Sequence, residues 1–338
     1  MSPAMDISVQ HFKLPDYLAK WPWSRTLHPN YDELRGESAS WIASLHGYLP
    51  QKTLDNYNPC LLACLAYPQR KKELVRLGCD LMYFYLVYDE STDVADDEEI
   101  TRAEDVVRKV LADPLSLSGS KHFIGKVVKR LREQAGDLVD FKASSNCLDH
   151  FIANMNAYTK AIGQEAEERK NKHLRGVEDY LLLRRDTGAA RPALALLEFG
   201  LELPDSVLYH PVVAELTDIT IVLLAIGNDM HSYAYEHASG LDGHNIVTAI
   251  MHEHKLDLQD ALDWLGVYAE ARVHRFLELM SHLPSCDSMT DSNLKIYIDG
   301  LGYWVRGNDN WSCEIRRYYG SGGLDVLKTK SFTLKSSK

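Results

Sequence analysis

Three oxygen-bearing side chains recur every four residues in the second half of the chain. They are Asn228, Ser232 and Glu236, which an α-helix would align in one stripe about 12 Å long. Their amide, hydroxyl and carboxylate oxygens suit Mg²⁺, which shares its remaining positions with water and substrate phosphate. The alternative is an ordinary polar helix face. That alternative is weakened because residues 219–226 are almost wholly apolar, and polar groups that continue a buried helix need partners.

A second acidic group ends an apolar, aromatic-rich run over residues 81–88. Asp89 and Asp93 are four residues apart, so on a helix they share a face with Tyr85, one turn earlier. Alone this string is weak evidence, because a buried helix that reaches solvent at its C-terminal end looks the same. Carboxylates are slightly unfavourable at that end of a helix, where the dipole prefers cations.

Two basic segments add a chemistry suited to phosphate. Arg184 ends a helical run shortly before Gly188, and Arg317-Tyr318 lies near the C-terminus. Each segment alone is better explained as solvated surface. Combined with the two acidic helices, their arginines can pair bidentately with phosphate oxygens. Together the four segments predict a diphosphate held by several Mg²⁺ ions.

Composition and missing motifs exclude other classes. A net charge of −11 does not suit a nucleic-acid binder, which needs a basic footprint. No secretory signal is visible in the first residues and no stretch approaches 18 consecutive apolar residues, so we expect a cytoplasmic protein without stable membrane insertion. Neither GxxxxGK[ST] nor GxGxxG follows a strand, which excludes an NTPase and a dinucleotide-binding protein. His252-Glu253-His254 is not HExxH, so it is not the zinc-binding motif of a zincin.

The elements that must position these residues are helices. Period-2 runs bounded by hairpin signals are absent, so we predict an all-α fold of about ten helices in a single domain over residues 1–338. Residues 1–35 are expected to form an irregular strap and residues 320–338 a C-terminal tail. The predicted helices cover residues 31–48, 71–93, 100–112, 125–134, 147–174, 177–188, 190–200, 214–237, 245–252, 258–281 and 291–306.

These motifs resemble those of class I terpene synthases. Residues 89–93 resemble their D(D/E)xxD motif, residues 228–236 match NDxxSxxxE, and Arg317-Tyr318 matches their C-terminal Arg-Tyr pair. Residues 184–188 resemble the diphosphate-sensing arginine and helix-break effector of microbial cyclases. The spacing of the motifs is also similar to the family. Finer features resemble fungal sesquiterpene synthases, and among them the Δ6-protoilludene synthases.

The resemblance implies an α-helical barrel that ionises farnesyl diphosphate with three Mg²⁺ ions, for which Mn²⁺ is a possible substitute. It implies cyclisation by 1,11-closure through a humulyl cation to a product such as Δ6-protoilludene, in a monomer or homodimer. The expected metal ligands are Asp89, Asp93, Asn228, Ser232 and Glu236. The expected diphosphate and substrate contacts are Arg184, Gly188, Arg317 and Tyr318. The candidates for the cavity wall are Tyr85, Met82 and Ala225, which lie on the metal-bearing helix faces, and Trp304 on a late helix; core packing is the alternative for each.

Two departures from the family pattern leave details open. Many relatives carry a basic residue just before the final glutamate, where this chain has Tyr235, so one diphosphate contact is in doubt. Glu90 replaces a second aspartate, so one alternative leaves Asp89 as the direct ligand with Asp93 paired to an arginine. Alternative functions are a synthase of an acyclic alcohol such as nerolidol or linalool, a chain elongase of the same fold, a synthase of another sesquiterpene, and a non-catalytic all-α binding module.

Overall fold

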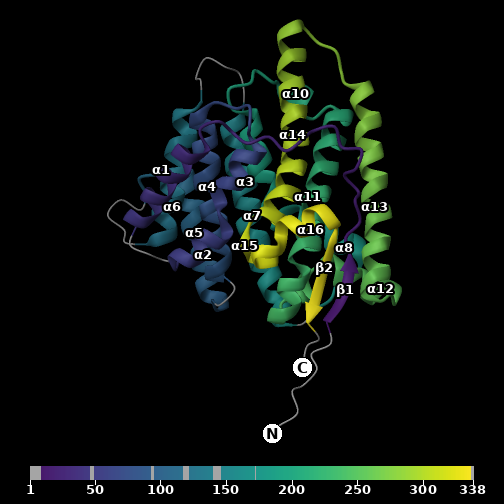
Figure 1. Ribbon diagram of the computed structural model, residues 1–338. Coiled ribbons are helices and arrows are strands. Elements are labelled where there is room, and N and C mark those ends of the chain that lie inside the picture. The colour runs from purple at the N-terminus through teal and green to yellow at the C-terminus, as the bar shows by residue number, and fades with distance from the viewer. Residues whose placement is uncertain are drawn as a thin grey trace.

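The computed structural model describes residues 9–45, 49–92, 95–116, 122–139, 146–171 and 173–335, whose helices lie side by side in one bundle (Figure 1). The α-helices are α1 (Tyr31–Ser44), α2 (Gln51–Tyr57), α3 (Pro59–Ala66), α4 (Lys72–Thr92), α5 (Asp97–Ala112), α6 (Phe123–Asp137), α7 (Cys147–Lys170), α8 (Val177–Thr187), α9 (Ala190–Ala195), α10 (Asp205–Leu208), α11 (Pro211–Ser239), α12 (Ile246–His254), α13 (Leu258–Leu279), α14 (Ser288–Glu314), α15 (Arg316–Tyr319) and α16 (Gly323–Thr329).

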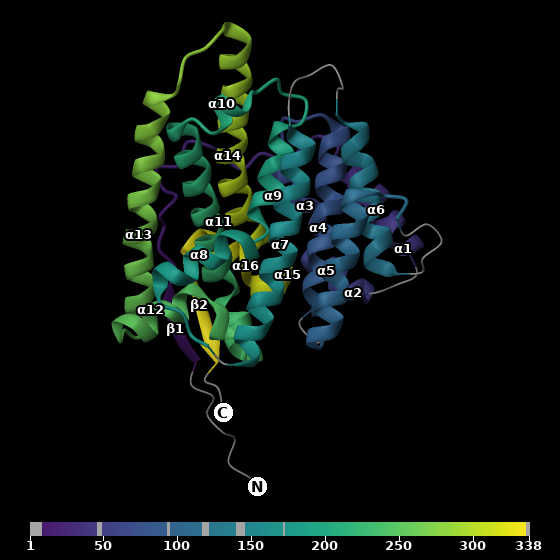
Figure 2. The same ribbon diagram turned by 180° about the vertical axis from the view of Figure 1, so that it is seen from behind.

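Helices α3, α4, α11 and α14 form the centre of the bundle. Helix α3 packs on both α4 and α14, and α14 packs on α11. Figures 1 and 2 show α13 and α6 at opposite edges of the bundle. The two helices with the acidic motifs, α4 and α11, therefore both belong to the interior, where a long apolar stretch gains free energy by leaving water.

Helix α11 has clear local reasons for its limits. Pro211 occupies the first turn, where its missing N–H costs nothing, and Gly240 ends the helix in the left-handed region with φ 71°. By length and composition α11 is the one helix in the described part of the chain that could cross a membrane, but 61% of its most apolar window is buried within the protein. That burial is typical of a core helix.

The predicted all-α fold is confirmed, and one small two-stranded sheet accompanies the helices. Strand β1 (Val9–Lys13) pairs antiparallel with β2 (Ser331–Lys335), and the rings of Phe12 and Phe332 face each other at 5.7 Å between centroids. This two-stranded sheet joins opposite ends of the chain. Because no short turn connects the two strands, the sequence contains no hairpin signal from which the sheet could be predicted.

The segment between β1 and α1 crosses the bundle (Figure 1) and is held by buried aromatic side chains. The indole of Trp21 donates to the carbonyl of Gly302 at 2.9 Å, and Arg306 donates to the carbonyl of Trp23 at 2.9 Å. A side chain at position 302 would place its Cβ 2.1 Å from the Trp23 ring, so the close approach requires glycine. Residues 14–30 thus form an irregular but firmly packed strap, whereas residues 9–13 of the expected strap belong to β1 and residues 31–35 to α1.

Several helices have bounds that differ from the prediction. Helices α2, α3, α10, α15 and α16 are short and were not predicted. Helix α14 was expected to end at Arg306 but continues to Glu314. Its polar extension is buried and partnered: Asn308 donates to the Leu224 carbonyl, and Asp309 pairs with His231. The expected C-terminal tail contains α16 and β2 in its described part.

Candidate active site

A cavity of about 170 Å³ opens among the central helices. Both charged or polar side chains and apolar or aromatic side chains line it. The lining residues are Tyr57, Pro59, Leu62, Met82, Tyr85, Leu86, Asp89, Tyr158, Arg184, Thr187, Gly188, Ala189, Ala190, Ala193, Leu224, Asn228, Trp304, Asn308 and Trp311.

A larger hollow of about 590 Å³ lies between α8, α11 and α13, but none of the predicted site residues lines it. Charged side chains line much of it, and they include pairs with each other such as Arg275 and Glu215 at 2.7 Å. The chemistry of the lining, not the size of the hollow, therefore identifies the smaller cavity as the candidate active site.

Many residues singled out in the sequence meet at this cavity. Asp89, Arg184, Gly188 and Asn228 line it, as do Tyr85, Met82 and Trp304 of the expected wall. Leu224 takes the place expected for Ala225, because it is the neighbouring position of α11 that turns inward. Asp93 lies outside the described residues.

Arg184 and Asn228 are in direct contact. The Nη2 group of Arg184 donates to Asn228 Oδ1 at 2.9 Å, and Asn228 Nδ2 donates to the Tyr318 hydroxyl at 3.1 Å. Helices α8, α11 and α15 thus present one residue each to the same point. The arginine expected to bind diphosphate lies against the amide expected to bind metal.

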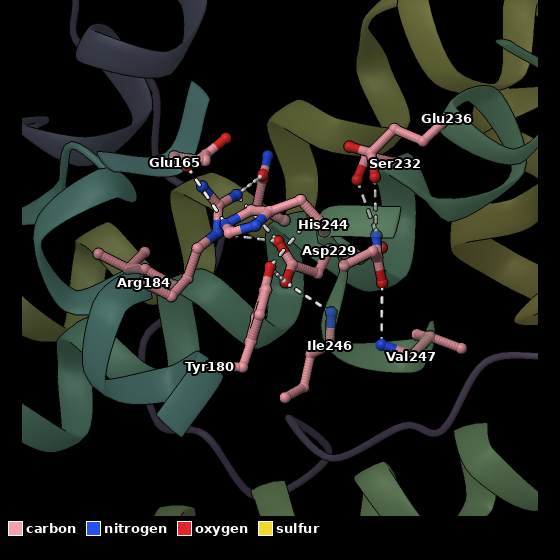
Figure 3. Close-up of polar contacts among 12 residues, drawn as sticks. Glu165, Tyr180, Arg184, Asp229, Ser232, Glu236, His244, Ile246 and Val247 are labelled. Carbon is pink, nitrogen blue, oxygen red and sulfur yellow. Dashed lines mark hydrogen bonds and ion pairs between the residues drawn. The ribbon is translucent and has the colours of Figure 1, made fainter. Parts of the chain in front are cut away.

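Asp229 is the central residue of this network and was missed in the sequence (Figure 3). Its carboxylate accepts from Arg184 at 2.9 Å, from the Tyr180 hydroxyl at 2.5 Å and from the Ile246 amide at 3.1 Å. The residue is only 1% exposed, so this ion pair is buried. An acidic residue directly after an apolar helix segment was the available signal, but its partner lies 45 residues away.

The other two members of the predicted metal stripe lie along α11 (Figure 3). The Ser232 hydroxyl donates to the Asp229 carbonyl at 3.3 Å, and Glu236 Oε2 accepts from Asn245 Nδ2 at 2.9 Å. Burial, with the nearby charge of Asp229, raises the pKa of Glu236 to about 7.

This donor set fits a divalent cation. The amide, hydroxyl and carboxylate oxygens are hard ligands, and a cation would offset the cost of a partly buried Glu236 carboxylate. No group of three His, Cys, Asp or Glu side chains within the described ranges converges as a metal site. A cation here would therefore rely on the mixed donors of α11 and on oxygens of a bound ligand.

A second buried pair lies beside Arg184. His244 Nε2 is 3.2 Å from Glu165 Oε2, which joins the 3-10 turn Asp242–His244 to α7 (Figure 3). Burial alone would raise the pKa of Glu165, but His244 and then Arg184 outweigh it and lower that pKa to about 2. Glu165 therefore adds a fixed negative charge next to the arginine.

The chain breaks its helical path between α8 and α9. The Gly188 amide donates to the Arg184 carbonyl at 2.8 Å, and Ala189 follows with φ 58°. A Cβ at position 188 would lie 2.7 Å from that carbonyl, so glycine is needed. The break turns residues 187–190 toward the cavity.

Arg317 does not line the cavity but lies at its edge. Its Nη1 group donates to Glu90 Oε1 at 3.1 Å, and its guanidinium carbon lies 4.4 Å from the Tyr57 ring centroid and 4.8 Å from that of Tyr235. Glu90 is thus tied to an arginine. Tyr235, at the position before Glu236 where many relatives carry a basic residue, contributes an aromatic ring next to Arg317.

His231 of α11 links this helix to α14 and α15. His231 Nε2 lies 3.1 Å from Asp309 of α14, and its Nδ1 lies 3.0 Å from the hydroxyl of Tyr319 in α15. Burial opposes the charged imidazole, but the hydrogen bond to Asp309 and the contact with Cys313 raise the pKa of His231 to about 9. Charges on His231 and Asp309 therefore hold α11 against α14.

Comparison with known proteins places the chain in context. Residues 80–275 match the sequence family described as terpene synthase family 2, C-terminal metal binding. The chain is 45% identical to sesquiterpene synthase Agr8 from Cyclocybe aegerita over 335 residues, covering 98% of this chain and 94% of the relative. It is 39% identical to a Δ6-protoilludene synthase from Armillaria gallica, covering 96% and 94%.

Solved structures share the fold. Germacradien-4-ol synthase from Streptomyces citricolor superposes with a TM-score of 0.75 at 21% identity, covering 86% of this chain and 98% of that one. Linalool/nerolidol synthase from Streptomyces clavuligerus superposes with a TM-score of 0.74 at 17% identity, covering 86% and 98%. At these identities the likeness concerns the arrangement of helices.

Proposed function

The chain belongs to terpene synthase family 2, and on that premise we propose that Asp89, Arg184 and Asn228 mark where it ionises farnesyl diphosphate and begins its cyclisation. It is a terpene synthase, a carbon–oxygen lyase that acts on an isoprenoid diphosphate and depends on a divalent metal. Its cyclised product is a sesquiterpene. The observation that supports the placement is the 2.9 Å hydrogen bond from Arg184 to Asn228 in the lining of a cavity that also contains aromatic side chains.

The diphosphate would bind where the cationic groups gather. Arg184 and Arg317 offer planar donors that match phosphate oxygens in pairs, and the Tyr318 hydroxyl lies 3.1 Å from Asn228 on the same side. Arg184 is already oriented by Asp229, which limits the freedom it loses on binding. Substrate contact by Gly188 at the helix break belongs to the same proposal.

Asn228, Ser232 and Glu236 would hold one Mg²⁺, and Asp89 would contribute to a second cluster, for three ions in all. Asp93 is proposed as a further ligand of that cluster. Mg²⁺ bound there would supply Lewis acidity, which neutralises charge on the diphosphate as it leaves. Mn²⁺, which also prefers oxygen ligands, is the expected substitute.

The remainder of the cavity would protect the carbocation. Tyr85, Tyr158 and Trp304 contribute ring faces whose quadrupoles attract a cation, and Leu62 and Leu86 contribute apolar surface. Exclusion of water by these side chains prevents quenching of the cation before cyclisation. We infer 1,11-closure through a humulyl cation and a product such as Δ6-protoilludene, the product that several relatives are named for.

Other features of the protein are part of the same proposal. Residues 1–338 would act as one domain, monomeric or homodimeric, in the cytoplasm. Closure of the Arg317 segment over bound diphosphate would couple binding to ionisation.

The test is a product assay. Purified protein is incubated with farnesyl diphosphate and Mg²⁺, with and without isopentenyl diphosphate, and the extract is analysed by gas chromatography–mass spectrometry. A cyclic C15 hydrocarbon is expected in both cases. An acyclic C15 alcohol as the main product would overturn the cyclisation, and a longer prenyl diphosphate would identify an elongase.

A further inference from the structure

The guanidinium of Arg317 lies over two tyrosine rings from different parts of the chain. Its central carbon is 4.4 Å from the ring centroid of Tyr57, the last residue of α2, and 4.8 Å from that of Tyr235 on α11. Both distances are within the roughly 6 Å at which a cation is attracted to a ring face. Tyr57 and Tyr235 together are the tyrosine clamp.

The clamp leaves the edge of the guanidinium for oxygen acceptors. An arginine carries its five N–H donors in one plane, and rings that lie over the guanidinium do not compete for donors at its rim. Glu90 accepts from one of these donors at 3.1 Å. The Arg317 side chain is only 17% exposed, so its attraction to the rings is weakly screened by water.

Tyr57 is itself held in place. The indole of Trp311 donates to the Tyr57 carbonyl at 3.1 Å, and the two rings lie 5.7 Å apart. The next residue, Asn58, has φ 41° and starts α3, and its side chain donates to the Tyr31 hydroxyl at 2.8 Å. Tyr57 therefore belongs to a rigid corner between two short helices that also borders the cavity.

Arg317, in contrast, is in α15, which has four residues. A long arginine side chain on so short a helix would lose much rotational freedom when it binds a ligand. Rings that already hold the guanidinium reduce that loss, and such preorganisation increases affinity.

We propose that Tyr57 and Tyr235 are positioning residues that hold Arg317 ready for the diphosphate and set the affinity for it. This inference rests on the proposed function, because it takes Arg317 as a diphosphate contact. On this proposal, the aromatic rings of Tyr57 and Tyr235 contribute to the affinity for diphosphate, and their hydroxyl groups do not.

The experiment measures the affinity for inorganic diphosphate in the presence of Mg²⁺ by isothermal titration calorimetry. Tyr57→Leu and Tyr235→Leu are each expected to weaken binding about fivefold to thirtyfold, the range for a desolvated cation over a ring. Tyr57→Phe and Tyr235→Phe keep the ring and should stay within about twofold of wild type. In kinetics with farnesyl diphosphate, the Leu variants should raise KM more than they lower kcat.

Two further variants separate the possible failures. Tyr268→Leu removes a cation–π pair with Arg272 on α13, outside the cavity, and should leave diphosphate affinity unchanged. Arg317→Ala should weaken binding at least as much as either Leu variant.

If Arg317→Ala binds like wild type, the diphosphate role of Arg317 is wrong. If it weakens binding but the Leu variants do not, or if the Phe variants fall as far as the Leu variants, the clamp is wrong. Should Tyr57→Leu fail to fold by circular dichroism, Tyr235→Leu alone decides between these results.

Discussion

Arg184 donates a hydrogen bond to the amide oxygen of Asn228 at 2.9 Å. The oxygen that accepts this bond is the one Asn228 would offer to a metal ion. A diphosphate that draws Arg184 toward itself would therefore free that oxygen at the same time. The contact gives a physical reason for metal and diphosphate to bind together, with the arginine and the amide exchanging partners.

Asn228→Ala should abolish turnover without unfolding the protein. It removes a proposed metal ligand and the acceptor for Arg184, so kcat/KM should fall by at least about a hundredfold. Helicity by circular dichroism should be unchanged, since Asn228 is only partly buried. Asn146→Ala is a matched control, because Asn146 is exposed and its side chain bonds only to Asp205 among the contacts described. Turnover near that of wild type in Asn228→Ala would refute the metal assignment.

Asp229→Asn should destabilise the metal-free protein. The substitution removes the carboxylate charge that is hydrogen-bonded to Arg184, and loss of one partner costs about 3–5 kcal/mol in comparable buried pairs. Tyr180→Phe, which removes one hydrogen bond to the same carboxylate, should cost about 1–2 kcal/mol. Urea denaturation followed by circular dichroism measures both. Equal losses for the two variants would mean that the charge of Asp229 is not what stabilises the site.

Gly188→Ala should lower activity by displacing the backbone that carries Arg184. The added Cβ would lie 2.7 Å from the Arg184 carbonyl oxygen, so one of the two must move. A displacement of about 1 Å at a binding group costs on the order of a hundredfold in rate. Gly243→Ala is the control, since nothing lies within 4 Å of its added Cβ. The relevant measurement is kcat/KM for farnesyl diphosphate. Equal activity of the two variants would show that the helix break tolerates a side chain.

The pair of His231 and Asp309 should make stability depend on pH. The folded state raises the pKa of His231 from its usual 6.5 to about 9, so folding is favoured by protonation. This contribution is complete below pH 6.5 and is lost as the pH rises through 9, up to about 3 kcal/mol. Glutamine cannot titrate in this range. Between pH 6.5 and pH 8.5, the unfolding free energy of His231→Gln, measured by urea denaturation, should therefore fall less than that of wild type. Parallel losses in the two proteins would contradict the raised pKa.

The sequence was most informative where function depends on spacing within one helix. Asn228, Ser232 and Glu236 fall on one side of α11 because four-residue spacing fixes the face, whatever surrounds the helix. The long helices were likewise predictable from their apolar periodicity. The spacing could not show that Arg184 lies against Asn228, because that contact joins helices 44 residues apart.

The features that were missed share a dependence on distant partners. Tyr57 ends a seven-residue helix without a side-chain cap, and it becomes significant through Arg317, 260 positions later. The strands β1 and β2 are five residues each and exist because they pair with each other. The end of α14 contains Asn308 and Asp309, which suggest a loop until their buried partners on α11 are known.

The most direct test of the central claim is the release of inorganic diphosphate from farnesyl diphosphate by the purified protein, measured with Mg²⁺ and again after chelation. The proposed site predicts rapid release with Mg²⁺, together with a volatile cyclic sesquiterpene, and no release after chelation until the metal is restored. Release at the same rate without a divalent metal, or none under either condition, would contradict it.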